Sequence, residues 1–181
     1  MMAALRLLLL PFSWLFGLVL CIRHLLYDHG WRKSTAPDLT TIVIGNIALG
    51  GTGKTPHVEL ALRVLAEHGP LATLSRGYGR DGTHFHEVHR EDDASVAGDE
   101  PLMLKRKFSG VRVFVGADRV AGIEAIKTAA PEVRAVVLDD AFQHRKLRAG
   151  LNIVLTSWRK PWNNDFLLPA GTLRDMPARA R

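Results

Sequence analysis

The stretch VIGNIALGGTGKTP, at residues 43–56, has the residue types that bind the phosphate groups of a nucleotide. Its clustered glycines allow backbone N–H groups to curl around a phosphate without a side chain in the way. Lys54 is spaced to reach the β- and γ-phosphates, and Thr55 to offer its hydroxyl group to Mg²⁺. The predicted contacts to the nucleotide, ATP, are Ala48, Leu49, Gly50, Gly51, Thr52, Gly53, Lys54 and Thr55.

One position departs from the general phosphate-loop pattern G-x-x-x-x-G-K-[ST], because Ala48 stands where the first glycine is expected. A β-branched apolar run precedes the loop, and Pro56 suits the first turn of a following helix, where no N–H donor is needed. The simpler alternative is a glycine turn followed by an exposed lysine. The strand–loop–helix context favours the phosphate loop.

A second motif, AVVLDDAFQH, places Asp139 and Asp140 at the end of an apolar run. A buried strand that delivers two carboxylates to the edge of a sheet is the arrangement of a Walker B strand. Aspartate is also common where a strand runs into a turn, so the motif alone has an ordinary structural interpretation. Gln143 and His144, which follow, belong either to a site or to a turn. Together with the phosphate loop, the motif predicts a metal site of Thr55, Asp139 and Asp140.

The motif AGDEPLML has two interpretations. Asp99 can cap the N-terminus of a helix, with Glu100 and Pro101 in the first turn. Alternatively, Asp99 can accept the proton of an attacking hydroxyl group, as the catalytic base of a kinase does. The residues alone favour the helix cap.

Other polar residues stand after predicted strands, and each has a structural alternative. Arg76, Tyr78 and Arg80 in SRGYGRDG either contact phosphate or sugar groups or belong to an exposed loop. Arg119 in GADRVAG either clamps a phosphate group or lies on an exposed helix face. No spacing typical of a metal-ligand cluster or of a Ser-His-Asp triad occurs in the sequence.

Apolar β-branched runs alternate with segments of helical period along the rest of the chain. Strands are predicted at residues 40–44, 71–75, 111–115, 135–138 and 151–155, with a weaker one at 84–88. Helices are predicted at residues 54–68, 99–108 and 118–130. This alternation is typical of an α/β fold of the P-loop NTPase type, with a mostly parallel sheet and helices on both faces. Ligands of such sheets bind at the carboxyl ends of the strands, where most of these motifs fall.

The first thirty residues are the most apolar part of the chain. As a helix, the uncharged run over residues 7–22 reaches about 24 Å, which is short of the ~30 Å hydrocarbon core of a bilayer. A spanning helix would therefore be strained. A buried core helix of a soluble protein is an alternative. A cleaved signal peptide is disfavoured, because CIRHLLYDHGWRK lacks a small-residue cleavage site.

Spacings of four and seven align a narrow polar stripe on this otherwise apolar helix. The stripe consists of Arg6, Ser13, Gly17, His24 and Asp28. The pattern predicts a membrane-associated helix over residues 1–30 that lies in the membrane interface, with the stripe facing water or the rest of the protein. Basic residues after the helix place the following domain, expected over residues 38–181, on the cytoplasmic side.

The composition fits one folded domain. A chain of 181 residues, 47% hydrophobic and 23% charged, can bury one full core. Its 24 Lys and Arg residues exceed its 18 Asp and Glu residues, and the net charge of +6 favours an acidic partner. Nothing in the sequence resembles a helix or platform that reads nucleic acid, so we expect no nucleic acid partner. The single cysteine, Cys21, excludes an internal disulfide and fits a reducing compartment.

In order along the chain, the apolar helix and the motifs GNIALGGTGKTP, LSRGYGR, GDEP, DDAFQHRKL and LLPAGTLRD resemble the tetraacyldisaccharide 4′-kinase family of lipid A biosynthesis. The resemblance covers nearly the whole chain. It implies an enzyme that uses Mg²⁺ and ATP to phosphorylate the 4′-hydroxyl group of a lipid-linked glucosamine disaccharide. The implied place of action is the cytoplasmic face of the inner membrane of a Gram-negative bacterium, and we expect a monomer at the membrane surface.

The resemblance also implies roles for single residues. The family's phosphate loop likewise has a small residue other than glycine in the place of Ala48, so this departure is typical of the family. Asp99 matches the acidic residue proposed as general base, which overturns the preference for a helix cap alone, although both roles can coexist. Asp139 and Asp140 match the Walker B pair, and Arg119 matches a position near the phosphates. The implied catalytic residues are Asp99, Lys54, Asp140 and Arg119.

Three departures from the family pattern stand out. Ala141 replaces the glycine of DDGFQH. Thr172 and Asp175 stand where LLPAGPLRE is usual, so the acidic role near the site would pass from Glu to a shorter side chain. Family members continue past this motif into a second lobe that closes over the cleft and carries a histidine partnered with the catalytic aspartate, whereas this sequence ends at Arg181. We therefore expect nucleotide binding more firmly than turnover.

Two other functions remain open from the sequence. A membrane-attached partitioning ATPase has a similar loop, KGGxGKT, but it needs a lysine where this chain has Leu49. A non-catalytic nucleotide-binding remnant of the kinase family would keep the phosphate loop without turnover.

Overall fold

The computed structural model describes residues 2–180, with side chains described from residue 6 onward. The chain divides into two compact units. The sheet unit comprises Thr35–Gly45 and Gly53–Ile153, and the helix unit comprises Met1–Ser34, Asn46–Thr52 and Val154–Arg181. The predicted phosphate loop therefore has its first part, up to Thr52, in the helix unit and its second part, from Gly53, in the sheet unit.

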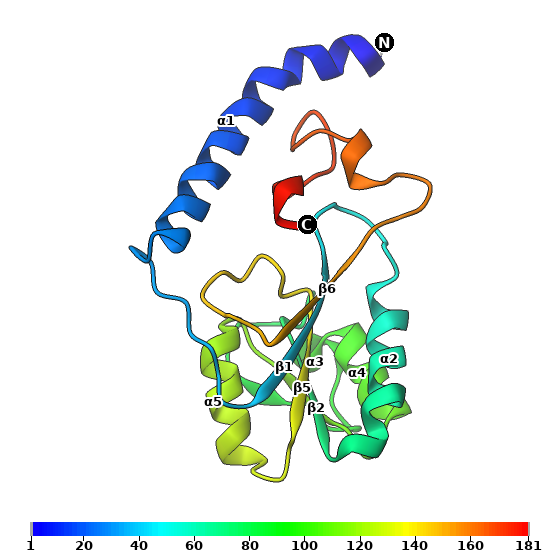
Figure 1. Cartoon of the computed structure of the whole chain (residues 1–181). Coiled ribbons are helices and arrows are strands. Elements are labelled where there is room, and N and C mark those ends of the chain that lie inside the picture. Colours follow the sequence, from blue (N-terminus) through cyan, green and yellow to red (C-terminus); the bar gives the residue numbers. More distant parts are fainter. Residues whose placement is uncertain (1, 181) are drawn as a thin grey trace. The chain divides into compact units, whose positions relative to one another are not determined.

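A six-stranded sheet with the order β3-β4-β2-β5-β1-β6 forms the centre of the fold (Figure 1). The strands are β1 (Thr40–Asn46), β2 (Leu71–Ser75), β3 (His86–Glu87), β4 (Arg112–Val115), β5 (Ala135–Asp139) and β6 (Leu151–Leu155). β5 lies between β1 and β2 and is parallel to both, and β2 is parallel to β4. Only the short β3 is shown to pair antiparallel, with β4. The predicted mostly parallel α/β sheet is thus confirmed.

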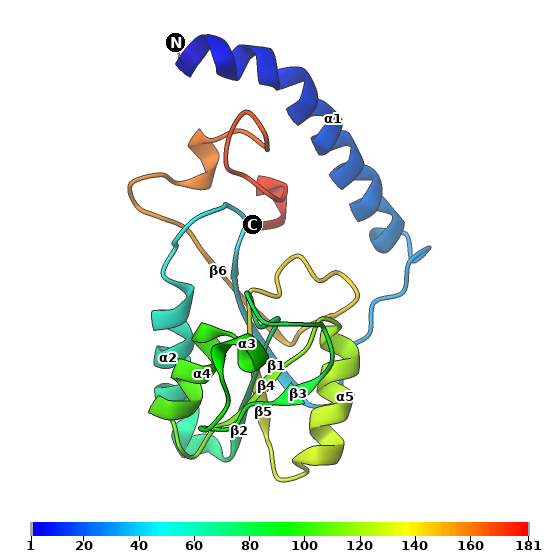
Figure 2. The same ribbon diagram turned by 180° about the vertical axis from the view of Figure 1, so that it is seen from behind.

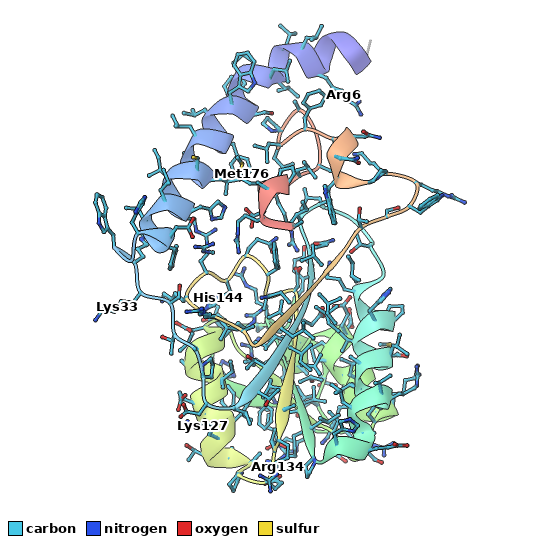
Figure 3. All side chains as sticks on the ribbon, viewed as in Figure 1. Arg6, Lys33, Lys127, Arg134, His144 and Met176 are labelled. Atoms are coloured by element: carbon cyan, nitrogen blue, oxygen red, sulfur yellow. The ribbon has the colours of Figure 1, made fainter. Side chains whose placement is uncertain are left out.

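The register of β1 and β5 brings two predicted motifs to one edge of the sheet. Thr40 lies opposite Ala135, and Ile44 lies opposite Asp139. β5 therefore ends beside Ile44, two residues before the end of β1, so the chain that leaves β1 towards the phosphate loop starts near the end of the acidic strand. Figure 3 marks this edge by His144, which follows β5, and the opposite edge by Arg134, which precedes it.

Helices cover both faces of the sheet. They are α2 (Lys54–Leu65), α3 (Ala94–Ala97), α4 (Asp99–Lys107) and α5 (Arg119–Ala129). Figure 2 shows α2 and α4 on one side of the strands and α5 on the other. The three predicted helices are confirmed, although the last turn after α2, Ala66–His68, is a 3₁₀ helix. The single turn α3 was not predicted, because four residues are too few to show a helical period.

The core of the sheet unit lies between these helices and the sheet. β-Branched and aromatic strand residues are completely buried, among them Val113, Phe114 and Val137. Such strands are covered on both faces, which explains why they appear in the sequence as continuous apolar runs. Val58 of α2 and Ile123 of α5 complete the core from the two sides, each with 0% of its surface exposed.

The helix unit is built on α1 (Met2–Asp28), with 3₁₀ turns at Trp162–Asn164 and Pro177–Ala180. Among the described residues, Arg6–Asp28 is the one segment that is long and apolar enough to cross a membrane by length and composition, with a mean hydropathy of 1.8. Only 17% of its most apolar window is buried, which argues against the alternative of a core helix. Ser13 and His24 of the predicted polar stripe are buried, whereas many apolar side chains of α1, such as Trp14, are exposed.

We predict that two chemically identical substitutions in α2 separate core packing from helix propensity. Val58→Ala removes a completely buried side chain, whereas Val64→Ala removes one that is 62% exposed. Both changes gain the same helix propensity, so Val58→Ala should lower the free energy of unfolding by about 2 kcal/mol relative to Val64→Ala. Urea denaturation followed by circular dichroism measures the difference. Equal free energies for the two variants would contradict the packing described for α2.

Candidate functional site

The phosphate loop has the backbone conformation that its glycines permit. Gly50 and Gly53 have φ angles of 108° and 78°, a left-handed region that side chains rarely allow. Ala48 has no such angle, since Asp140 is the single non-glycine residue with positive φ in the described chain. The position where the general pattern has glycine therefore needs no special backbone freedom here, and a methyl group fits.

The first part of the loop is braced within the helix unit. Asn46 is completely buried, and its amide nitrogen donates to the Thr52 hydroxyl over 2.8 Å. The amide oxygen of Asn46 accepts from the Arg174 guanidinium over 2.6 Å. The backbone N–H of Leu49 donates to the Thr172 carbonyl over 2.7 Å. Asn46 and Arg174 were not predicted as site residues, because their partners lie far away along the chain.

A hollow of about 180 Å³ opens beside this part of the loop. It is lined by the loop residues that follow β1 and by the chain that follows β6. The lining outside the loop includes Leu155, Thr156, Ser157, Lys160, Trp162 and Thr172. The hollow combines an indole ring, hydroxyl groups and one cationic side chain next to the glycines.

In the sheet unit, the second part of the loop lies beside carboxylates from two other elements. The ammonium group of Lys54 is 3.8 Å from a carboxylate oxygen of Asp140. The Thr55 hydroxyl donates to a carboxylate oxygen of Glu100, at the start of α4, over 3.3 Å. Asp140 adopts a φ of 51°, a strained conformation for a non-glycine residue that is typical of functional sites. The structure thus brings Lys54, Thr55 and Asp140 together, with Glu100 as a neighbour that we had placed only in a helix turn.

Of the carboxyl groups at this edge of the sheet, Asp139 has the most strongly shifted pKa. It is 6% exposed, and its Oδ1 atom has no hydrogen-bond partner among the described residues. Burial raises the pKa of Asp139 to about 6, and the charges of Glu100 and Asp140 add to the shift. Lys54 and Arg119 oppose it. A buried carboxylate oxygen without a partner is an available ligand for a cation.

Arg119 is a buried cation, so the alternative that it lies on an exposed helix face is wrong. It is 4% exposed, and its guanidinium donates to the carbonyl groups of Gly116 and Ala117 over 2.8 and 3.0 Å. Its Nε atom has no partner among the described residues. Burial lowers the pKa of Arg119, and the negative charge of Asp140 opposes that shift. Arg119 therefore shares the electrostatic environment of the acidic pair.

Asp99 begins α4 but does not cap it. Gly98 takes the N-cap position, with a φ of 86°. A side chain on Gly98 would meet the Tyr78 carbonyl at 3.1 Å, so the glycine also permits close approach of the neighbouring loop. The N-cap interpretation of Asp99 is therefore wrong. Its side chain is exposed and lines an open hollow of about 610 Å³, together with Asp92, Asp93, Ala94, Leu102, Met103, Arg106 and Lys107.

The remaining predicted polar residues differ in their surroundings. Arg80 is 9% exposed and donates to the backbone carbonyl groups of Arg76 and His84, so it stabilises its own loop. Tyr78 in the same loop is 92% exposed. His144 lies 3.6 Å from the Asp118 carboxylate, and burial lowers its pKa.

Asp175 does not have the acidic role near the site that we expected. Its side chain is completely buried and forms an ion pair with His24 of α1 at 2.7 Å. It also accepts from the backbone N–H of Met176 over 2.8 Å. The neighbouring residue Arg174 contacts the loop instead, as described above. The shorter aspartate is therefore a structural anchor for α1.

Across residues 2–180, no group of three or more His, Cys, Asp or Glu side chains is assembled as a metal site. The predicted set of Thr55, Asp139 and Asp140 has one hydroxyl group and two carboxylates. Mg²⁺ in nucleotide sites is commonly held by one or two carboxylates together with phosphate oxygens.

Comparison with known proteins points to one family. The family model for tetraacyldisaccharide-1-P 4′-kinase matches residues 5–181. A tetraacyldisaccharide 4′-kinase from Flavobacterium johnsoniae is 44% identical over 174 residues, which cover 96% of this chain and 51% of that protein. One from Bacteroides fragilis is 46% identical over 174 residues, covering 96% of this chain and 46% of that protein. The chain spans about half the length of the curated relatives it matches.

A solved structure is also similar. The crystal structure of LpxK from Aquifex aeolicus, described as an "apo" form in complex with ATP, matches with a TM-score of 0.89 and 35% identity. The match covers 98% of this chain and 56% of that chain. The fold described above is therefore the fold of the corresponding part of LpxK.

The perturbed carboxyl group predicts a pH-dependent stability. Because the folded state raises the pKa of Asp139 above its ordinary value of 3.8 to about 6, its contribution to stability is lost as the pH rises from about 4 through about 6. Asp139→Asn should therefore raise the free energy of unfolding at pH 7.5 by roughly 2 kcal/mol, without Mg²⁺, and leave it nearly unchanged at pH 4.

Urea denaturation at both pH values measures this effect, and the exposed Asp81→Asn serves as the control. Asp81→Asn makes the same exchange of side chains at an exposed position, and so controls for the substitution itself. If the stability of Asp139→Asn followed the same pH dependence as that of the unsubstituted chain, the perturbed state of Asp139 would be disproved.

Proposed function

The chain belongs to the tetraacyldisaccharide-1-P 4′-kinase family, and from that premise we propose that it forms the ATP-binding region of a lipid A 4′-kinase. In the proposed reaction, the γ-phosphoryl group of ATP moves to the 4′-hydroxyl group of a tetraacylated glucosamine disaccharide 1-phosphate. The observation that carries the proposal is the phosphate loop whose Lys54 lies 3.8 Å from the acidic strand end at Asp140. We assign residues 38–181 to the kinase region and residues 1–30 to a membrane-associated helix.

We propose that ATP binds along the loop from Ala48 to Thr55. The positive φ angles of Gly50 and Gly53 are compatible with a loop that curves its backbone N–H groups around a phosphate. The start of α2 adds the positive end of a helix dipole, and Lys54 adds a full charge. The hollow next to the loop, with Trp162 and hydroxyl groups, offers space for the nucleoside part of the ligand. ATP is also the nucleotide named for the similar structure of LpxK.

The residues near Asp139 fit Mg²⁺. Asp139 offers a buried carboxylate oxygen that has no partner in the described chain, and Lys54, which precedes Thr55, lies 3.8 Å from the Asp140 carboxylate. We assign Thr55, Asp139 and Asp140 as the residues that would hold the ion. When bound, Mg²⁺ neutralises charge on the phosphate oxygens during transfer. Glu100, which accepts from Thr55, would orient that hydroxyl group.

We propose Asp99 as the general base. Its exposed carboxylate at the start of α4 would accept the proton of the 4′-hydroxyl group. The hydroxyl oxygen then bonds to the γ-phosphorus, the bond from that phosphorus to the bridging oxygen breaks, and ADP leaves. The open hollow at Asp99 combines apolar Leu102 and Met103 with cationic Arg106, which suits an acceptor that carries both acyl chains and phosphate.

We propose that Arg119 and Lys54 stabilise the negative charge that develops on the phosphoryl group during its transfer. Both are cations beside the acidic pair, and the Nε atom of Arg119 has no partner among residues 2–180. A buried cation is effective in this role because little water screens it. Its carbonyl partners hold the guanidinium in place, so no reorganisation is needed during transfer.

We further propose that α1 attaches the enzyme to the cytoplasmic face of the inner membrane. The outward side of the helix is apolar, with Phe12, Trp14 and Leu15 each more than 60% exposed. Ser13 and His24 of the polar stripe lie on its buried side. A helix with this distribution gains free energy when its apolar side enters a lipid interface. The membrane surface also holds the proposed lipid-linked acceptor, and we propose that the enzyme acts there as a monomer without nucleic acid.

Two substitutions should separate nucleotide binding from phosphoryl transfer. Lys54→Ala should weaken MgATP binding by roughly 100-fold, because it removes the charge that faces the phosphates. Asp99→Asn should keep MgATP binding within about twofold and abolish transfer to the disaccharide, since only proton acceptance is lost. Isothermal titration calorimetry measures MgATP binding to each variant. Transfer of radioactive phosphate from γ-labelled ATP to the disaccharide measures the activity of each variant.

Lys127→Ala on α5 is the control for a lost surface cation and should change neither quantity. Unchanged MgATP affinity in Lys54→Ala would reject the phosphate-loop assignment. MgATP binding without any transfer by the unsubstituted protein would favour the non-catalytic alternative.

The exposed face of α1 should determine membrane binding. The double variant Leu15→Asp and Leu18→Asp places two carboxylates on side chains that are 61% and 56% exposed, and should reduce co-sedimentation with anionic phospholipid vesicles at least about tenfold. Leu60→Asp on α2, where the leucine is 53% exposed, is the matched control and should bind vesicles normally. Equal sedimentation of the double variant and the control would refute attachment through α1.

A further inference from the structure

The buried side of α1 is held by the C-terminal segment of the helix unit, which we define as residues 165–180. The Ser13 hydroxyl donates to the Leu167 carbonyl over 2.9 Å and accepts from the Ala170 N–H over 3.0 Å. Gly17, one turn further, leaves room for the Leu167 side chain, because a Cβ atom there would lie 2.9 Å from it. His24 completes the row by its ion pair with Asp175. Polar contacts thus attach α1 to this segment at two places.

The His24–Asp175 pair is a strong anchor because it is buried. The side chains of His24 and Asp175 are 9% and 0% exposed, and the facing atoms are 2.7 Å apart. The other carboxylate oxygen of Asp175 accepts from Arg179 over 3.3 Å. A carboxylate in this position is stable only while its partners are present, so removal of one partner leaves a buried charge with less compensation.

The same segment holds the first part of the phosphate loop. Leu173 forms an antiparallel bridge with Ala48. The Arg174 N–H donates to the Ile47 carbonyl over 2.8 Å, and the Arg174 side chain reaches Asn46. These contacts come directly before Asp175 in the sequence. One short stretch, residues 172–175, is thus bonded on one side to the loop and on the other side to α1.

We propose that His24 and Asp175 are positioning residues for ATP binding, and that docking of α1 through them sets the conformation of the phosphate loop. The path consists of α1, the ion pair, the adjacent residues Leu173 and Arg174, and the loop at 46–49. Each step is a hydrogen bond, an ion pair or a peptide link within the helix unit. The inference rests on the proposed function of the loop as an ATP site.

The exposed apolar side of α1 would link membrane binding to the conformation of the phosphate loop. A helix with a buried polar row and an apolar outer side is fixed in its orientation when that outer side enters a lipid interface. Binding of α1 to the membrane then favours the conformation in which His24 contacts Asp175. Through Asp175 it also favours the loop conformation that Leu173 and Arg174 hold. By thermodynamic reciprocity, vesicles should strengthen MgATP binding, and MgATP should strengthen vesicle binding by the same factor.

The test compares substitutions at His24 with one on the outer side of the same helix. His24→Ala should weaken MgATP binding roughly fivefold to tenfold in calorimetry. His24→Gln retains a donor near the position of Nε2 and should stay within about twofold of the unsubstituted chain. Cys21→Ala, at an exposed position of α1, should not change the affinity. Ser13→Ala loses the hydrogen bonds to Leu167 and Ala170 and should weaken MgATP binding about threefold. This variant replaces His24→Ala in the test if His24→Ala fails to fold.

A second readout separates positioning from general destabilisation. In the presence of anionic phospholipid vesicles, the unsubstituted chain and Cys21→Ala should bind MgATP at least about threefold more tightly than without vesicles, whereas His24→Ala should show no gain. Folded His24→Ala or Ser13→Ala with unsubstituted MgATP affinity and the full vesicle effect would overturn this inference alone. Failure of the unsubstituted chain to bind MgATP would overturn the proposed function as well.

Discussion

The parallel pairing of β1 with β5 is the constraint on which the rest of the structure depends. Because Ile44 lies opposite Asp139, the strand that carries the acidic pair ends two residues before the end of the strand that leads to the phosphate loop. Hydrogen bonds along both strands fix this register, and the buried apolar side chains on both faces prevent a slip. The distance from Lys54 to Asp140 follows from it. A shift of one residue would turn every side chain of the strand to the opposite face of the sheet and would displace the carboxylates relative to the loop.

This edge of the sheet contains several groups that are unfavourable for stability. Asp139 is a buried carboxyl group with a pKa raised to about 6, Arg119 is a buried cation, and Asp140 has a strained backbone. Each feature costs free energy in the folded chain, and the remaining core, with residues such as Phe114 and Val137 completely buried, must offset that cost. The proposed binding of Mg²⁺ and ATP gives a physical reason for the arrangement, since a cation and an anion would compensate the charges that the protein leaves unmatched.

The helix unit poses a different physical problem, because α1 combines buried polar side chains with exposed apolar ones. Its polar side chains, Ser13 and His24, are buried against protein, and its outer surface is apolar. In water this distribution is unfavourable, but at a lipid interface the hydrophobic effect stabilises it. The C-terminal segment supplies the polar partners, and the same segment braces the loop. Membrane attachment and nucleotide binding thereby use one set of contacts in the proposed enzyme.

The sequence by itself determined the elements and the motifs. All six strands, the helices α2, α4 and α5 and the mostly parallel sheet were predictable, because hydrophobic period and Gly and Pro signals act over neighbouring residues. The phosphate loop and the Asp139–Asp140 pair were recognisable for the same reason, since their chemistry is local. Only the tertiary structure decided the partners. Asn46 with Arg174, Thr55 with Glu100 and His24 with Asp175 are separated by 45 to 151 residues, and no local pattern records such pairs. It also showed that Gly98 caps α4 and that Asp175 anchors α1, because burial and hydrogen bonding depend on what folding brings into contact.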